Sequence, residues 1–202
     1  MSYIKISKAF CMKKIIIILA LALVCFNAGI LPAAEPQATP IVHGAVFTAT
    51  DGQAYTAAEI NMLNEGLEAR YNVTGAPFSG VREYFENYSL IQVKPYVNGK
   101  LHGIMQGYYP TGQILHDVPF INGAINGTVK NYHANGVISR TTPFVNGKTE
   151  GLAKIYNEQG RIIKEISYVN GVIEGECKRF DAVANTWTIN VYKNGVKVSS
   201  KQ

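Results

Sequence analysis

The chain is poor in the residues from which disulfides and metal centres are built. Its 202 residues include three cysteines and four histidines, and none of them stands in a Cys-x-x-Cys or His-x-x-His spacing. A metal site needs several convergent ligands, and a cysteine nucleophile needs a base beside its thiol. No Gly-rich loop of the phosphate-binding type opens a helix pattern either. We therefore expect no catalytic, metal or cofactor-binding residues and predict that the protein is not an enzyme.

Long apolar runs are also missing. The longest run, from Ile15 to Phe26, has about 12 residues, whereas a bilayer-spanning helix needs roughly 20. Four lysines precede it and small residues follow at 28–29 and 33–34. A basic segment, a short apolar segment and a small-residue exit are typical of a secretory signal peptide. We predict a signal peptide over 1–34, with export to the periplasm, the cell envelope or the medium. The alternatives are an uncleaved anchor and a buried core helix.

Several details of this leader stay open. The start is Met1 or Met12, and cleavage follows Ala33 or Ala34. Lipidation at Cys25 is disfavoured because Val24 rather than a small residue precedes it. Cleavage would remove two cysteines and leave Cys177 as a single thiol, so no intrachain disulfide is expected.

Charged residues make up only 16% of the chain. Of its 19 basic residues, four lysines lie in the leader, so 15 basic residues face 14 acidic ones in the remainder. A nucleic-acid-binding domain usually carries a basic footprint. The near-neutral balance therefore predicts that nucleic acid is not a partner. An asymmetry remains, because residues 95–202 carry twelve basic and seven acidic residues.

What the sequence has in abundance is a repeat. The segment Pro95-Tyr-Val-Asn-Gly99 recurs at a step of 24 residues, as an aromatic residue, one variable residue and Asn-Gly, up to Val191-Tyr-Lys-Asn-Gly195. An unbroken period of this length indicates a stacked repeat architecture. We divide the chain from residue 71 into the units 71–94, 95–118, 119–142, 143–166 and 167–190 and a partial unit, 191–202.

Each unit contains two turn signals. Asn-Gly tolerates positive φ at both positions, as a type I′ hairpin turn requires. A second turn ends in glycine at Gly112, Gly136 and Gly160, and the last full unit has lost this glycine. The turns leave strands of about seven or eight residues. The predicted fold is all-β: an elongated single antiparallel sheet, or solenoid, of stacked β-hairpins.

The repeat columns indicate what packs the sheet. Two aromatic columns recur, and a third glycine column, which begins at Gly103, recurs beside the two in the turns. An aromatic ring of the neighbouring strand is expected to pack on this third glycine column. Cys177 shares a column with Met105, Val129 and Ala153 and is predicted to be a small core residue. Prolines near the Asn-Gly turns are expected at strand ends or bulges. The predicted structural repeat residues are Tyr96, Gly99, Gly103, Tyr108, Phe120, Gly123, Gly127, Tyr132, Phe144, Gly147, Gly151, Tyr156, Tyr168, Gly171 and Gly175.

The segment 35–70 precedes the repeats. Its first residues read as a polar linker, and the run from Ala45 to Thr50 followed by Asp51-Gly52 reads as a degenerate entry hairpin. Thr56-Ala-Ala-Glu59 matches a helix capping box, and Ile60, Leu63 and Leu67 follow at helical spacing. We therefore predict a short helix from about Ala57 to Ala69 that caps the open first edge of the sheet.

The pattern Tyr96…Gly99…Gly103…Tyr108…Gly112…Ile114, with copies at 120–138, 144–162 and 168–180, resembles the MORN repeat variant found in YwqK-type antitoxin-like proteins. The resemblance covers roughly residues 71–198. It implies an elongated sheet of hairpins that binds a protein partner, and it supplies no catalytic residues to transfer.

Two basic columns are the candidate partner-binding residues: Lys130, Lys154 and Lys178 in one, and Arg140 and Lys164, in line with His116, in the other. They would form basic rungs along the sheet, although interleaved glutamates also fit an ordinary solvated face. The leading hypothesis is an exported, non-enzymatic repeat scaffold that binds a protein partner through a sheet face and is antitoxin-like in its action. The alternatives are a binder of anionic lipid or glycan at the envelope surface and an enzyme with an unrecognised site.

Overall fold

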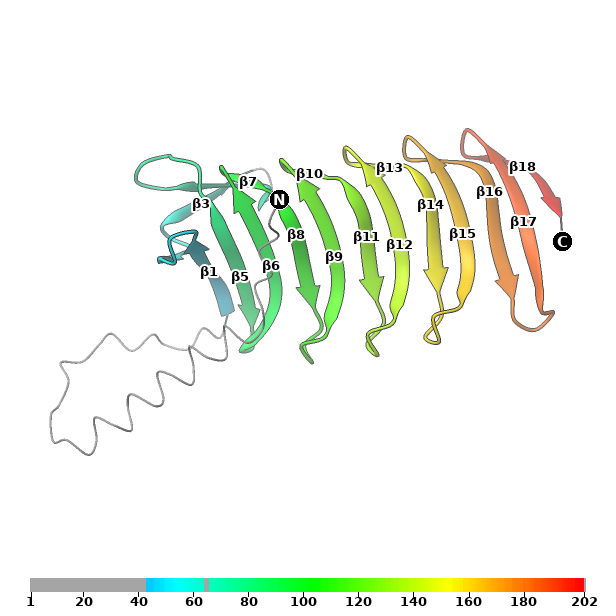
Figure 1. Cartoon of the computed structure of the whole chain (residues 1–202), viewed down its shortest axis with the longest axis horizontal. Coiled ribbons are helices and arrows are strands. Elements are labelled where there is room, and N and C mark those ends of the chain that lie inside the picture. Colours follow the sequence, from blue (N-terminus) through cyan, green and yellow to red (C-terminus); the bar gives the residue numbers. More distant parts are fainter. Residues whose placement is uncertain (1–42, 64–65, 202) are drawn as a thin grey trace, which may run out of the picture. The chain divides into compact units, whose positions relative to one another are not determined.

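The computed structural model describes residues 43–63 and 66–201, and these form one antiparallel sheet of 18 strands (Figure 1). The all-β hairpin architecture predicted from the repeat is therefore confirmed. The predicted signal peptide, 1–34, and the linker up to residue 40 lie outside the described residues. Within the described part, no helix is apolar and long enough to cross a membrane. The strands are β1 His43–Ala49, β2 Ala54–Thr56, β3 Ile60–Leu63, β4 Glu68–Tyr71, β5 Gly80–Glu86, β6 Ser89–Val97, β7 Lys100–Leu101, β8 Gly103–Tyr108, β9 Ile114–Ile121, β10 Ala124–Ile125, β11 Gly127–Tyr132, β12 Ile138–Val145, β13 Lys148–Thr149, β14 Gly151–Tyr156, β15 Ile162–Val169, β16 Val172–Asp181, β17 Thr186–Lys193 and β18 Val196–Lys201.

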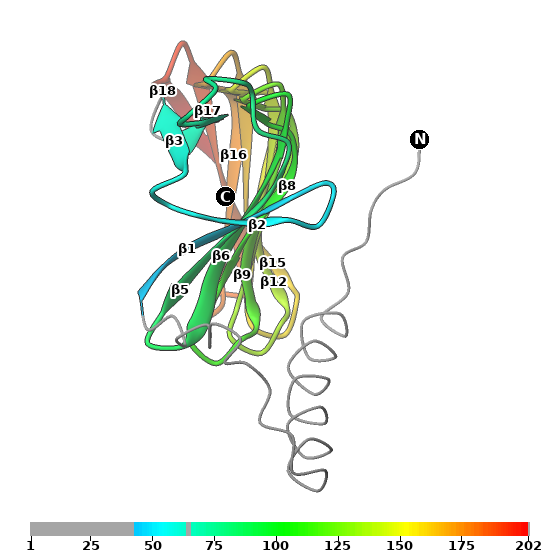
Figure 2. The same ribbon diagram turned by 90° about the vertical axis from the view of Figure 1, so that its left-hand side faces the viewer.

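The Asn-Gly turns join the strands at one end of the sheet. Asn122 and Gly123 have φ angles of 51° and 87°, and the four other Asn-Gly pairs from Asn98 to Gly195 also have positive φ at both residues. This is the geometry of a type I′ turn, whose twist matches that of antiparallel strands. At the other end, Gly112, Gly136 and Gly160 take positive φ in longer turns. Seen along the row of strands, the resulting sheet is strongly twisted (Figure 2).

Successive units are joined by hydrogen bonds at the Asn-Gly end. The amide of Gly123 donates to the carbonyl of Leu101 over 2.8 Å, and Gly147, Gly171 and Gly195 donate in the same way to the unit before them. Side chains add to these bonds in the last repeats. The Glu150 carboxylate accepts from the Asn170 amide at 2.7 Å, and Glu174 accepts from the Asn194 amide at 2.6 Å. Each turn is therefore fixed to its predecessor as well as to its own strands.

The prolines lie where the neighbouring strand is interrupted, as expected for a bulge position. Pro119 accepts a hydrogen bond from Asn126, which separates β10 from β11, but it has no amide to donate in return. In the same way, Pro95 accepts from His102, which separates β7 from β8, and Pro143 accepts from Glu150, which separates β13 from β14. In the next unit Ser167 takes the proline's place, and there β16 is one continuous strand.

The same prolines correct an expectation about the glycines. Gly103 and Gly127 do pair in register with Phe120 and Phe144. However, a side chain at either glycine would meet the ring of a proline, Pro95 or Pro119, at 3.1 Å. The ring that packs on this glycine column therefore comes from the strand before it and is not aromatic.

The predicted helix from Ala57 to Ala69 is wrong. Strands β3 and β4 occupy this segment and pair from Ile60 with Tyr71 to Leu63 with Glu68. Half of the predicted capping box forms, because the amide and hydroxyl of Thr56 both donate to the Glu59 carboxylate at 2.8 Å. The Glu59 amide donates to the Thr56 carbonyl at 3.1 Å and not to the Thr56 hydroxyl. These bonds close a turn instead of opening a helix. The entry hairpin predicted before it is present as β1 and β2, which pair from Val46 to Thr48.

The β3–β4 hairpin covers one face of the sheet at its N-terminal end. Its Ile60 and Ala69 are buried together with Phe47, Phe78 and Tyr96 in the main hydrophobic cluster. The phenol of Tyr96 donates to the carbonyl of Gly66 over 2.6 Å, and the Phe78 ring meets the Tyr96 ring edge-on at 6.1 Å. The capping role that we assigned to a helix is thus carried by a hairpin, which lies over a face of the sheet.

Candidate binding faces of the sheet

Residues that pair directly across antiparallel strands point to the same face, so the register assigns the two predicted basic columns. Lys130 pairs with Asp117 and with Thr141, Thr141 pairs with Lys154, and Lys154 and Lys178 both pair with Glu165. We call the face with this row the lysine face. A neighbouring row joins His116, Asn131, Arg140, Ile155, Lys164 and Arg179. It lies on the opposite side, which we call the arginine face. The five predicted binding residues are therefore divided between two faces.

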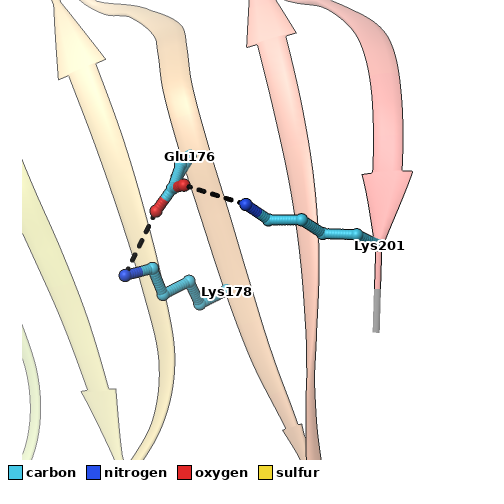
Figure 3. A network of polar contacts seen from close by, with 3 residues as sticks. All are labelled: Glu176, Lys178 and Lys201. Carbon is cyan, nitrogen blue, oxygen red and sulfur yellow. Dashed lines mark ion pairs between the residues drawn. The ribbon is translucent and has the colours of Figure 1, made fainter.

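The lysine face alternates charges. Along its central row, Asp117 precedes Lys130, and Glu165 lies between Lys154 and Lys178. Glu176 forms ion pairs with Lys178 at 3.1 Å and with Lys201 at 3.8 Å (Figure 3). Exposed pairs of this kind contribute little stability. The balanced charges of the lysine face fit the alternative given above, an ordinary solvated face, better than a row of basic binding residues.

A hydrogen-bonded group occupies the N-terminal part of the lysine face. Gln106 donates to Asp117 at 3.0 Å, and the Tyr132 phenol donates to the other oxygen of that carboxylate at 2.9 Å. The Tyr108 phenol completes the group by donating to Gln106 at 3.0 Å. Burial, reinforced by the bond to Asp117, raises the pKa of Tyr132 to about 12. Of these two tyrosines of the predicted repeat pattern, Tyr132 therefore joins neighbouring units, whereas Tyr108 orients Gln106 within its own unit.

The lysine face also carries an apolar stripe beside the Asn-Gly turns. Val97, Ile121, Val145 and Val169 precede the first four of the five Asn-Gly turns and are each 46–50% exposed. Ile104 and Leu152 lie one row further in and are also exposed. Because each repeat contributes two strands, the stripe recurs about every 9.6 Å. An apolar stripe beside a row of lysines gives this face an amphipathic character.

The arginine face differs in charge. In the three rows from β8 to β16 that contain Phe120, Val118 and His116, the sequence places no acidic residue. Arg140 donates through Nε to the buried hydroxyl of Thr142 at 3.1 Å. No carboxylate in the described part of the chain lies within ion-pair distance of Arg140, Lys164 or Arg179. Asp181, two residues after Arg179 on the same face, interacts with it electrostatically. The three central rows of this face are nevertheless positively charged, because they contain Arg140, Lys164 and Arg179 and no acidic residue.

The same face carries the first aromatic column, and its exposure increases along the chain. Tyr96 is 1% exposed and Phe120 is 8% exposed, whereas Phe144, Tyr168 and Tyr192 are half-buried. The β3–β4 hairpin accounts for the covered end, where burial raises the pKa of Tyr96 to about 12. The row between the aromatic and basic rows is the most buried one: Met105 and Val129 are partly buried, and its other members from β9 to β16 are buried, namely Val118, Thr142, Ala153, Ile166 and Cys177. The predicted core role of Cys177 is thus confirmed.

Two more cations lie on the arginine face near its N-terminal end. Arg82 lies 5.9 Å from the centre of the Phe47 ring and 5.4 Å from that of Tyr84, which are cation–π distances. Its Nε is buried without a hydrogen-bond partner. Burial, with a smaller effect of Arg82, lowers the pKa of Lys94. Neither Arg82 nor Arg179 belongs to the predicted binding residues, because no basic residue recurs in the repeat column of either one.

Three of the histidines differ in their surroundings in the sheet: His116 is partly buried, His133 bonds to a neighbouring unit and His102 is exposed. His116 lies against Gly107, where a Cβ would be only 2.4 Å from its ring, and burial lowers its pKa. His102 contacts Asn122 at 3.4 Å, and His133 reaches the carbonyl of Tyr156 at 3.1 Å. Among the residues that the structure describes, no group of three or more His, Cys, Asp or Glu could hold a metal ion.

The family model described as the MORN repeat variant matches residues 101–122, 125–146 and 149–170. These three matches follow one another at the 24-residue step of the hairpins and include Arg140 and Lys164 on one face and Lys130 and Lys154 on the other. No curated protein matches the chain significantly.

Proposed function

We propose that this chain, whose central segment consists of MORN-variant repeats, is an exported, non-enzymatic scaffold that binds a protein partner through its arginine face. Repeats of this type are generally modules that bind proteins or membrane lipids and have no catalytic role. The observation that carries the proposal is the row Arg140, Lys164 and Arg179, which makes no ion pair within the described residues and lies on the same face as half-buried aromatic rings. Among these three cations, Asp181 at the end of β16 interacts electrostatically with Arg179 only.

The composition of this face favours a protein over other partners. Protein interfaces are enriched in arginine and aromatic residues and depleted in lysine. The arginine face offers Arg140 and Arg179 together with Phe144, Tyr168 and Tyr192, at positions that the β3–β4 hairpin leaves uncovered. A complementary partner has an acidic surface that also presents apolar side chains. A toxin neutralised by this contact would be one such partner, and export favours a partner in the envelope or outside the cell.

The experiment is a gentle crosslinking pull-down from the native envelope fraction. The double variant Arg140→Glu, Lys164→Glu reverses two charges on the arginine face, and Lys130→Glu, Lys154→Glu makes the same change in the same repeats on the lysine face. We expect the first pair to abolish capture of the partner and the second to leave it unchanged. Equal loss in both, or no captured protein with the unmodified chain, would contradict the proposal.

A second candidate function is contact between the lysine face and an anionic membrane surface. It is favoured by the half-exposed aliphatic stripe of Val97, Ile121, Val145 and Val169, on the same face as three lysines. Each lysine near an anionic membrane contributes about 1 kcal/mol. Sedimentation with vesicles containing phosphatidylglycerol tests it. Binding should disappear in the triple variant Lys130→Glu, Lys154→Glu, Lys178→Glu, and binding that is unaffected by these changes would exclude the role.

A further inference from the structure

A pocket of about 360 Å³ lies between the last two full repeats, at the end of the sheet opposite the Asn-Gly turns. In Figure 1 this is the lower end, where the turn between β14 and β15 lies beside the turn between β16 and β17. Its lining residues are Asn157, Arg161, Ile162, Ile163, Phe180, Ala182, Asn185 and Trp187. Phe180 and Trp187 pair in register, with ring centres 5.4 Å apart and planes tilted by 52°. They belong to the lysine face, because Phe180 follows Lys178 by two residues.

A change in one repeat column explains why a pocket lies at this junction. In the two earlier junctions, the residue that begins the turn bridges to the next unit: Tyr109 donates to the carbonyl of Tyr132 at 2.8 Å, and His133 contacts that of Tyr156 at 3.1 Å. The third member of the column is Asn157. Its side-chain oxygen instead accepts from its own turn, from the amides of Gln159 at 3.1 Å and Arg161 at 2.9 Å. The shorter side chain stays within its own hairpin and leaves the junction open.

The lining has the chemistry of a ligand site and not of a packing defect. Two aromatic rings and two isoleucines form an apolar surface, while two amides and a guanidinium lie around it. In the described part of the chain, Arg161 makes no ion pair and the Nδ2 of Asn157 donates to no protein group. Small-molecule sites typically combine an apolar wall with a few polar groups that fix orientation, at volumes from about 300 Å³ upward.

We propose that this pocket binds a sugar ring that carries a carboxylate, as in a uronic acid unit of an acidic polysaccharide. The apolar C–H face of the ring packs on Trp187 and Phe180, and the hydroxyl groups bond to the amides of Asn157 and Asn185. Arg161 holds the carboxylate through a charge-assisted hydrogen bond, for which the guanidinium is well suited. The site is independent of the protein-binding role of the arginine face.

Trp187 is the only tryptophan of the chain, so its fluorescence reports on this pocket alone. The probes are galacturonic acid and its trimer, with galactose as the neutral match and benzoate as an aromatic carboxylate. We expect the two uronates to change the fluorescence in a saturable way and galactose to bind at least about tenfold more weakly, as loss of a charged hydrogen bond implies. Equal binding of galactose, preferential binding of benzoate or no response to the uronates would overturn the proposal.

Two variants separate binding from folding. Arg161→Gln lies in an exposed turn and should weaken uronate binding about tenfold or more, with unchanged circular dichroism. Asn157→His installs the side chain that bridges the preceding junction at His133, so it should close the pocket and remove binding while the fold is kept. Arg140→Gln removes the same charge from the arginine face and serves as the control that keeps binding. Full uronate binding in both Arg161→Gln and Asn157→His would refute the site.

Discussion

The buried row of the arginine face leads to a quantitative test of which side of the sheet holds the repeats together. Ile166 is 6% exposed and pairs with Ala153 on one strand and with Cys177 on the other. Both neighbours are small, so they cannot fill the space left by an Ile166→Ala substitution. Truncating a buried isoleucine to alanine costs about 2–5 kcal/mol. We expect about 3 kcal/mol here, because a single-layer sheet lets part of the cavity open to water.

The matched control lies on the same strand. Val169 is 46% exposed and belongs to the lysine face, so Val169→Ala should cost less than about 1 kcal/mol. Urea unfolding followed by Trp187 fluorescence and by circular dichroism measures both variants. For a domain of this size, a loss of 3 kcal/mol corresponds to a fall in Tm of about 6–12 °C.

The location of the damage is also predicted. Stacked repeats contact only their neighbours, so a lost interface destabilises the adjoining hairpins first. Hydrogen exchange in the Ile166→Ala variant should therefore accelerate in β14–β17 before it does in β5–β9. Equal costs for the two substitutions, or a cost below about 1 kcal/mol for Ile166→Ala, would refute the assignment of the packed row.

Three further predictions concern single contacts. Gly107→Ala places a Cβ 2.4 Å from the His116 ring, so we expect it to destabilise by about 1–3 kcal/mol in urea unfolding, and His116→Ala in the same chain should recover most of the loss. Glu174→Ala removes the acceptor of the Asn194 amide, which should cost about 0.5–1.5 kcal/mol and speed amide exchange in β18, whereas Glu158→Ala in an exposed turn should change neither. Because the pKa values of Tyr96 and Tyr132 are raised to about 12 from the ordinary tyrosine value of 10.0, the folded state keeps these protons to higher pH than the unfolded chain does. Below about pH 10 these two groups should therefore cause no change of stability with pH, and between pH 10 and 12 they should lower the free energy of unfolding. Tyr96→Phe should reduce this fall in unfolding experiments at a series of pH values. An unchanged slope would contradict the burial of this phenol.

Where sequence reasoning failed, two periodicities competed over a short segment. Thr56 and Glu59 make half of the contacts expected of a capping box, but a turn satisfies these as well as a helix does. Ile60 and Leu63 fit helical spacing, whereas burial of Ile60 and Ala69 with exposure of Asn61 and Arg70 follows a period of two. β4 pairs with the unit 95–118 through Glu68 and Lys100. These two residues lie too far apart in the sequence for a local pattern to predict their pairing.

The binding residues illustrate a second limit. Lys130 and Arg140 lie ten residues apart, an even spacing that suggests one face. The hairpin turn and the register shift between Asn131 and Tyr132 break this parity, so the two side chains point to opposite sides. The pocket at Trp187 could not be predicted from the sequence either, because it depends on whether Asn157 bonds to its own turn or to the next repeat.

The sequence by itself determined the hairpin, its period and its turns. Positive φ at Asn-Gly is a local property of two residues. Because the same signal recurs every 24 residues, it predicts successive hairpins that stack into one antiparallel sheet. Tertiary structure alone decided which residues share a face, which cations lack a counter-charge, and what covers the first repeat. These depend on register, bulges and pairing between distant strands, and such long-range contacts become defined only when the whole sheet has formed.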